Sequence, residues 1–154
     1  PGTSQGEWTN NGTGYNTSQF YGADKRPGAQ QYIGGMQDNS TYYSLEGEVA
    51  NDKSQYATNI SLSGDGFEAI WNNLDGKKII GGSQFNNFSR SMDGGQTWSR
   101  AINGFTLSGS SPDQSKFPFI SKLANSRQAP DILFTVGSEG IWKSVDFGGT
   151  WVLT

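Results

Sequence analysis

The sequence contains no cysteine and no histidine among its 154 residues. Their absence excludes Ser-His-Asp and Cys-His nucleophile systems within the chain. It also excludes zinc sites of the usual Cys/His kind, haem held by His or Cys, and disulfide bonds. Acid–base chemistry would have to use Asp, Glu, Tyr or Lys. We expect no cofactor and no metal site.

Charge is scarce as well. Charged residues make up 16% of the chain, and the net charge is −3. Lys and Arg occur singly or in pairs, so nucleic acid is not an expected partner, because phosphate neutralisation needs clustered cations. Every apolar run is far shorter than the ~20 residues of a membrane span. No signal peptide is visible, and Pro1 is not a natural start, so we expect a mature or excised piece of a longer protein.

Glycine (22 residues) and aromatic residues (13%) are abundant instead. The apolar residues come in short bursts, rich in aromatic and β-branched types and bounded by Gly, Asn, Asp, Ser or Pro, which is typical of strands and turns. No window shows sustained helical spacing, so the sequence predicts an all-β fold. The predicted strands are 19–23, 31–35, 41–45, 67–71, 78–82, 88–91, 97–102, 117–123, 132–136, 140–144 and 150–153.

Two patterns recur along the chain. The stretch 32–37 is echoed by 79–84, and the stretch 91–98 by 144–151. A period of about 50 residues with about four short strands in each unit indicates a β-propeller blade or a related array. The predicted units are approximately 18–62, 63–110 and 111–154. Residues 1–17 are predicted to be a loop or the end of a preceding blade, and 103–116 a connector.

The second pattern reads Ser-x-Asp-x-Gly-x-Thr-Trp, and we call its two copies the aspartate turns. The first copy consists of Ser91, Asp93, Gly95, Thr97 and Trp98; the second consists of Ser144, Asp146, Gly148, Thr150 and Trp151. The glycine pairs 94–95 and 148–149 are predicted to supply positive φ, and each aspartate to accept backbone N–H bonds. Each tryptophan is expected to cover its hairpin and pack toward the next blade. These roles are structural.

The aspartate turns resemble the Asp-box, or bacterial-neuraminidase repeat, of sialidases, sortilin-type receptors and xyloglucanase-like glycoside hydrolases. The stretches 19–21 with 32–39, and 64–66 with 78–84 and 89–91, are similar to the sortilin and xyloglucanase-like branch. The resemblance covers about 18–154 and implies a partial β-propeller of about three four-stranded antiparallel blades, with its aspartate turns away from the ligand face. Three blades leave two blade faces exposed, so further blades in the same or another chain are expected partners.

Two carboxylates are candidates for chemistry. The strand order predicts that Asp38 and Asp65 approach each other near the axis of the ring, on the loop side of the blades. Paired carboxylates across a cleft are what a glycosidase uses as acid and nucleophile, or as acid and base. Both residues also lie in turn-forming sequences, so the alternative is that each only caps a turn.

The same loops offer neutral amides and one aromatic ring for binding. These candidates are Gln37, Asn39, Gln84, Phe85, Asn86 and Asn87, with Phe85 the best candidate for an exposed ring. The sequence therefore favours an extracellular segment of a larger secreted bacterial protein that binds glycan or protein on its loop face. A xyloglucanase-like glycoside hydrolase half-site and a non-catalytic receptor-type scaffold remain alternatives. Sialidase activity is not expected, because the four arginines have no recognisable sialidase context and no Tyr–Glu nucleophile pair is evident.

Overall fold

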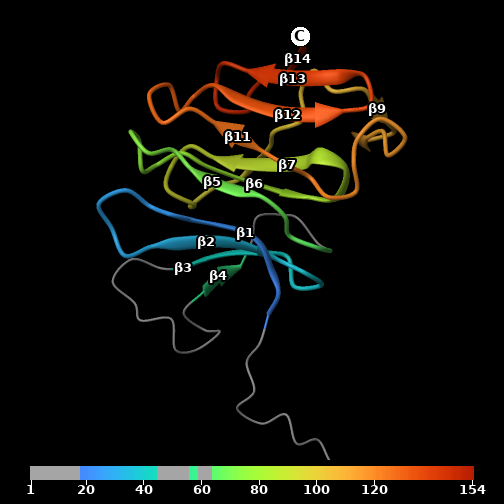
Figure 1. The fold of residues 1–154 in the computed structure, drawn as a ribbon. Coiled ribbons are helices and arrows are strands. Elements are labelled where there is room, and N and C mark those ends of the chain that lie inside the picture. The colour runs from blue at the N-terminus through green and yellow to red at the C-terminus, as the bar shows by residue number, and fades with distance from the viewer. Residues whose placement is uncertain (1–17, 45–55, 59–63) are drawn as a thin grey trace, which may run out of the picture.

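The computed structural model describes residues 18–44, 56–58 and 64–154 (Figure 1). These residues form strands and turns, with one 3-10 turn, η2 (Gln84–Asn86), and no α-helix among them. The all-β prediction is confirmed. The loop predicted at 1–17 and the parts of the first unit at 45–55 and 59–63 lie outside the described residues.

Three four-stranded antiparallel sheets stack one on another in chain order (Figure 1). We call them blades 1, 2 and 3. Blade 1 contains β1 (Phe20–Lys25), β2 (Tyr32–Met36), β3 (Thr41–Ser44) and β4 (Tyr56–Thr58). Blade 2 contains β5 (Ala69–Trp71), β6 (Ile79–Ser83), β7 (Asn87–Ser91) and β8 (Ser99–Arg100). Blade 3 contains β11 (Ala124–Asn125), β12 (Leu133–Gly137), β13 (Gly140–Ser144) and β14 (Val152–Leu153). Each sheet lies within one predicted unit, and the unit boundaries themselves stay predictions.

The connection between blades 2 and 3 differs from the sequence-based expectation. The strand predicted at 117–123 is wrong: this stretch is irregular, and only the short β11 follows it. Pro118 has no backbone N–H to give to a strand ladder. Inside the predicted connector at 103–116, β9 (Leu107–Ser108) and β10 (Ser111–Pro112) form a small hairpin.

The junction between blades 1 and 2 depends on closely approaching backbones. A small buried cluster fills it, formed by Ile33, Tyr43, Ala69, Trp71 and Ile79. Beside this cluster, a Cβ on Gly35 would collide with the backbone of Phe67, and one on Gly66 would collide with the carbonyl of Ser40. Glycine is required at both positions because only glycine lets the two blades come this near.

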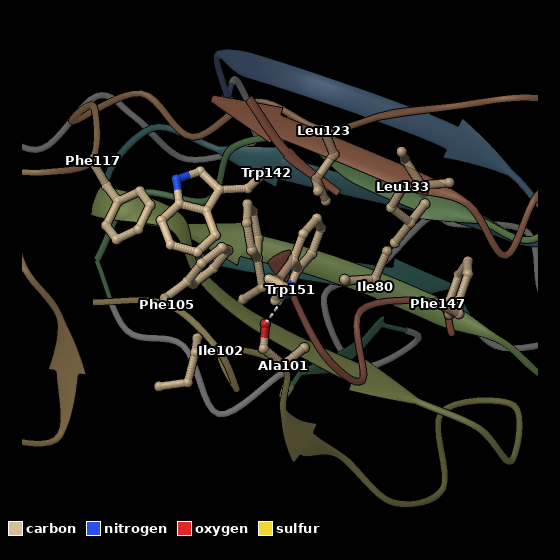
Figure 2. Close-up of a cluster of buried hydrophobic side chains, with 12 residues drawn as sticks. Ile80, Ala101, Ile102, Phe105, Phe117, Leu123, Leu133, Trp142, Phe147 and Trp151 are labelled. Carbon is tan, nitrogen blue, oxygen red and sulfur yellow. Dashed lines mark hydrogen bonds between the residues drawn. The ribbon is translucent and has the colours of Figure 1, made fainter. Parts of the chain in front are cut away.

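The junction between blades 2 and 3 is larger, and half of its buried residues are aromatic (Figure 2). Its buried residues are Ile70, Ile80, Phe88, Ala101, Ile102, Phe105, Phe117, Leu123, Leu133, Trp142, Phe147 and Trp151. Phe105, from the connection, stacks on Trp151 with ring centroids 5.1 Å apart and meets Trp142 edge-on at 5.3 Å. Such offset and edge-on pairs add to the stabilisation that comes from apolar burial.

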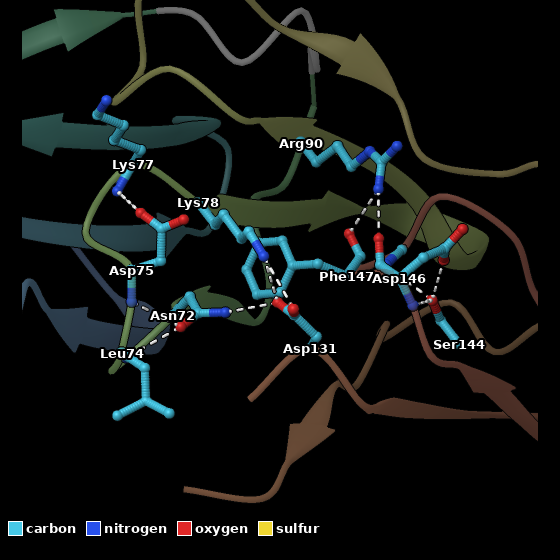
Figure 3. A network of polar contacts seen from close by, with 11 residues as sticks. Asn72, Leu74, Asp75, Lys77, Lys78, Arg90, Asp131, Ser144, Asp146 and Phe147 are labelled. Atoms are coloured by element: carbon cyan, nitrogen blue, oxygen red, sulfur yellow. Dashed lines mark hydrogen bonds and ion pairs between the residues drawn. The ribbon is translucent and has the colours of Figure 1, made fainter. Parts of the chain in front are cut away.

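A polar network also ties blade 2 to the loop before β12 (Figure 3). Both carboxylate oxygens of Asp131 accept from the Lys78 ammonium at 2.8 Å, and Oδ1 also accepts from the Asn72 amide at 2.8 Å. The Asn72 side-chain oxygen in turn accepts the backbone N–H groups of Leu74 and Asp75. The loop between β5 and β6 is thereby held against blade 3.

Candidate functional site

In both aspartate turns the carboxylate accepts hydrogen bonds from residues of its own turn. In the first copy, Asp93 Oδ1 accepts the N–H of Thr97 at 2.9 Å and Oδ2 accepts the Thr97 hydroxyl at 2.6 Å. The hydroxyl of Ser91 donates to Asp93 and accepts the N–H of Gly95 at 2.8 Å. The hydrogen bond from the Thr97 hydroxyl, followed by those from the Thr97 N–H and the Ser91 hydroxyl, lowers the pKa of Asp93 to about 2.

The second aspartate turn repeats this pattern. The Ser144 hydroxyl donates to Asp146 Oδ1 at 2.7 Å and accepts the N–H of Gly148 at 2.8 Å, and the N–H of Thr150 donates to Asp146 at 2.8 Å. Partial burial raises the pKa of Asp146, but the hydrogen bonds from Ser144 and Thr150 outweigh it, so the net shift is downward. Both carboxylates are engaged in their own turns.

The two turns differ from the prediction in backbone and in packing. Gly94 (φ +79°) and Gly95 (φ +93°) supply positive φ in the first copy, whereas Phe147 (φ +55°) and Gly148 (φ +78°) do so in the second. Gly149, which was expected to do this, does not have positive φ. A bulky residue tolerates the left-handed region only when its surroundings hold it there, and the Phe147 ring is fully buried.

The tryptophans of the turns pack backward rather than forward. The ring of Trp98 lies 6.0 Å from that of Tyr43 in blade 1, and the ring of Trp151 lies 5.7 Å from that of Phe88 in blade 2. The prediction that they pack toward the next blade was wrong. Each tryptophan instead joins its own blade to the preceding one.

One end of the molecule gathers the loops between the second and third strands of the blades. In each case the loop is hydrogen-bonded to a connection between blades. Ser40 N donates to Gly64 O at 2.9 Å, Phe85 N to Pro118 O at 3.1 Å, and Ser138 N to Lys116 O at 2.7 Å. We call this end the loop face; it consists of residues 36–40, 64–67, 83–87, 116–121 and 137–139.

The structure brings Asp38 and Asp65 together on the loop face. Asp65 Oδ1 accepts the backbone N–H of Asp38 at 2.6 Å, and Oδ2 accepts the amide of Gln84 at 3.3 Å. The backbone of Asp38 is left-handed (φ +57°), and its side chain is exposed. Asp65 therefore caps a turn in blade 1 from the start of blade 2, and Asp38 presents the carboxylate that faces solvent. Their catalytic role stays a prediction.

The predicted amides have different surroundings. The amide of Gln84 donates a hydrogen bond to Asp65. Asn39 is exposed, and its amide donates to the carbonyl of Gln37 at 2.9 Å. Asn87 is half-buried, and its side-chain oxygen accepts from Arg100 at 3.0 Å. Asn39 is thus the most accessible amide of the predicted set.

Asn86 belongs to the interior and not to the ligand surface. It is fully buried, its N–H donates to the hydroxyl of Ser121 at 2.7 Å, and its amide donates to the carbonyl of Val136 at 2.9 Å. Because its side chain crosses from blade 2 to blade 3, Asn86 fastens the two blades and cannot reach a ligand.

A row of aromatic rings runs from Tyr21 of β1 across the loop face. Tyr21 packs on Phe67 with ring centroids 4.7 Å apart, Phe67 meets Phe119 at 5.7 Å, and Phe119 meets Phe85 edge-on at 5.5 Å. Phe67 is fully buried and Phe85 half-buried, whereas Phe119 is 51% exposed. The exposed ring expected at Phe85 is therefore found at Phe119, with the 41%-exposed Ile120 next to it.

Sequence reasoning missed Phe119 because the surrounding residues suggested a strand. The proline at 118 was the available signal, because it makes the neighbouring backbone a poor strand and leaves its carbonyl free to hold the loop at Phe85. The aromatic row ends at Phe85, whose sequence neighbour Gln84 holds Asp65. The loop face thus carries both an exposed ring and a polar cluster with one open carboxylate.

A separate hollow of about 530 Å³ lies along the innermost strands β1 and β5 and the segment around β11. Its carboxylates are engaged: Asp24 accepts the N–H of Trp71 at 2.7 Å, and Glu68 pairs with Lys122 at 3.2 Å. Across the described ranges, no three acidic side chains gather to hold a metal ion. In the same part of the chain no helix is long and apolar enough to span a membrane.

No protein-family model matches the sequence, and a search of curated proteins found no match. Among solved structures, an ancestral GH74 enzyme is similar with a TM-score of 0.64 and 13% identity, covering 88% of this chain and 18% of that enzyme. YCF48 bound to D1 peptide gives a TM-score of 0.44 at 17% identity, covering 89% of this chain and 41% of that one. The stacked four-stranded sheets and the likeness to the GH74 enzyme define the fold as a partial β-propeller.

Proposed function

We propose that this propeller segment binds a carbohydrate chain on its loop face, as part of a larger secreted protein. The single observation that carries the proposal is the exposed ring of Phe119, which packs on Phe85 on the same loop face as the Gln84–Asp65–Asp38 cluster. A sugar ring has an apolar C–H face and a rim of hydroxyls. An exposed aromatic ring on the same face as amide and carboxylate groups matches both parts.

The polar groups of the loop face have two roles, since some hold the loop in place and others are exposed to a ligand. Asp65 and Gln84 are occupied with each other and with the N–H of Asp38, so they set the shape of the loop. Asp38 and Asn39 are exposed at the tip of the same loop and offer an acceptor and a donor to sugar hydroxyls. The hydrogen bonds from the N–H of Asp38 to Asp65 and from the N–H of Ser40 to the carbonyl of Gly64 hold this tip in one conformation before a ligand arrives, with positive φ at Asp38 (+57°) and Ser40 (+61°).

The test is a titration of the chain with xyloglucan and other β-glucan oligosaccharides, followed by calorimetry. β-Glucans are the first choice because of the likeness of the fold to a GH74 enzyme and the similarity of the sequence to the xyloglucanase-like branch. Phe119→Ala is expected to weaken binding about tenfold, which is ~1.4 kcal/mol. Phe134→Ala, at an exposed ring on blade 3, is the matched control and leaves binding unchanged. Equal affinity of the wild type and Phe119→Ala contradicts the proposal.

The second candidate function is a glycoside hydrolase half-site, favoured by the adjacency of Asp38 and Asp65 across the first blade junction. Release of reducing ends from β-glucans by the wild type, lost in Asp38→Asn with binding retained, would establish it. Asp65→Asn also loosens the turn of Asp38, so its thermal unfolding has to be measured alongside. Binding without turnover leaves the carbohydrate-binding function. If no glycan binds, a receptor-type scaffold for a protein ligand is the remaining function.

A further inference from the structure

The face of blade 3 that points away from blade 2 carries exposed apolar side chains. Along β12, Leu133 and Thr135 are buried toward blade 2, while Phe134 and Val136 are 38% and 47% exposed. Ile141, opposite Val136 on β13, is 50% exposed. We call Phe134, Val136 and Ile141, with Lys143, the open face.

Strand register shows what the open face corresponds to in blade 2. Ile79 lies opposite Ser91 in blade 2, as Leu133 lies opposite Ser144 in blade 3, and these two serines begin the aspartate turns. Counting from these pairs, the positions equivalent to Phe134, Val136, Ile141 and Lys143 are Ile80, Gly82, Phe88 and Arg90. Ile80 and Phe88 are fully buried in the junction with blade 3. Blade 3 therefore repeats, on its outward side, the apolar positions of Ile80 and Phe88 that blade 2 uses to hold its neighbour, and it differs by a valine, Val136, where blade 2 has Gly82.

The position of Lys143 carries a side-chain hydrogen-bond donor in all three blades. Tyr43 is paired with Ile33 in blade 1, Arg90 with Ile80 in blade 2, and Lys143 with Phe134 in blade 3. The three pairs occupy the same place in the sequence repeat.

Two of these donors already reach the next blade. The Tyr43 hydroxyl donates to the carbonyl of Gly95 at 2.9 Å, in the aspartate turn of blade 2. Arg90 donates to the carbonyls of Asp146 at 2.6 Å and Phe147 at 3.1 Å, in the aspartate turn of blade 3 (Figure 3). Blade 1 and blade 2 thus each hold the backbone of the aspartate turn in the following blade.

We propose that the open face docks a further four-stranded blade that carries an aspartate turn, with the Lys143 ammonium donating to the carbonyls of that turn. Its ammonium now lies 6.0 Å from the centre of the Phe134 ring, on the open face itself. In blade 2 the equivalent residue Phe88 packs against Phe105 and Trp151, so the further blade would offer apolar rings of this kind to Ile141 and Phe134. Blade 1 of a second copy does not fit this description, because its sequence between β3 and β4 has no Ser-x-Asp-x-Gly-x-Thr-Trp element.

The probe is the full chain extended by a second copy of its own residues 102–154 after Thr154. Thr154 is equivalent to Ala101, so this extension places an aspartate-turn blade after blade 3 at the spacing found between blades 2 and 3. We expect amide hydrogen exchange in β12 and β13 to slow about tenfold relative to the unextended chain, with a higher Tm. The double variant Phe134→Ser with Ile141→Ser is expected to remove both gains, while changing the unextended chain little.

Two further comparisons make the test specific. Lys143→Met is expected to remove part of the gain and Lys143→Arg to keep it, since arginine can also donate to carbonyls. Leu74→Ser, at an exposed side chain away from the open face, is the control that keeps the full gain. The proposal is overturned if the extension leaves hydrogen exchange in β12 and β13 unchanged. It is also overturned if the extension protects the double variant as much as it protects the wild type. A concentration-dependent dimer of the unextended chain that the double variant abolishes overturns it as well, because it assigns the open face to a second copy.

Discussion

Blade 2 is held on its two sides by junctions of different kinds. Toward blade 1, glycine backbones approach closely beside a small apolar cluster; toward blade 3, a large set of aromatic rings is buried (Figure 2). Apolar burial stabilises a junction in proportion to the area that is buried. Close backbone contact buries little apolar area and instead requires that the two surfaces fit together. The comparison shows that one blade can bury a large apolar area on one side and depend on close backbone fit on the other. We therefore expect different kinds of substitution to destabilise the two junctions.

The largest effect is expected from removing an aromatic ring from the second junction. Phe88 is fully buried and contacts both Phe105 and Trp151. Phe88→Ala should lower the free energy of unfolding by ~3–5 kcal/mol, because it leaves a cavity among rings that cannot close over it. Urea unfolding measures this, with Phe20→Ala, at a 59%-exposed ring, as the control. A loss below ~1 kcal/mol would show that the junction repacks freely.

The first junction should break by crowding and not by cavity formation. In Gly35→Ala the new methyl group meets backbone atoms of Gly66 and Phe67, which cannot rotate away. We expect a loss of about 3 kcal/mol in the free energy of unfolding, with faster hydrogen exchange concentrated in β1–β3. Gly109→Ala is the control, since its φ is +65° and no atom lies within 4 Å, so it adds only local strain in the β9–β10 hairpin. Exchange that rises equally in all three blades would contradict a local role for Gly35.

The aspartate turns provide a matched pair for the next prediction. Ser91 and Ser144 are both buried, and each hydroxyl accepts a backbone N–H four residues on. Ser91→Ala and Ser144→Ala should each cost ~1–2 kcal/mol, because the N–H of Gly95 or Gly148 loses its buried acceptor. Ser108→Ala, at an exposed hydroxyl, should stay within ~0.5 kcal/mol in the same urea experiment. Very unequal losses would mean that the two turns are not equivalent.

The smallest expected effect is the acid response of the first aspartate turn. The folded-state pKa of Asp93 is about 2, below the ordinary 3.8, so the folded state favours the charged carboxylate. Its contribution is therefore complete above pH ~3.8 and is lost as the pH falls toward 2. The Tm of the wild type should fall more between pH 5 and pH 2 than that of Asp93→Asn. Parallel Tm curves for the two proteins over this range would refute the assignment.

Much of the fold could be predicted from short stretches of sequence. The aspartate turns were predicted from residue types alone, because a serine, an aspartate and glycines at that spacing complete their own hydrogen bonds. The failures involve neighbours distant in sequence. Asn86 lies in a polar loop, yet Ser121 and Val136 of the following connection and blade bury it. Trp98 and Trp151 were expected to face forward, but only the packed blades reveal that they face back.

The sequence by itself determined most of the blade strands, the aspartate turns and the period that makes one blade like the next, because these depend on sterics and hydrogen bonds among residues a few positions apart. Only the tertiary structure decided that Phe119 is the exposed ring, that Asp65 caps the loop of Asp38, and that Arg90 donates hydrogen bonds to the aspartate turn of the next blade. Those outcomes depend on which surfaces meet when whole blades stack. The burial of a side chain is therefore a property of the neighbouring blade as much as of its own residues.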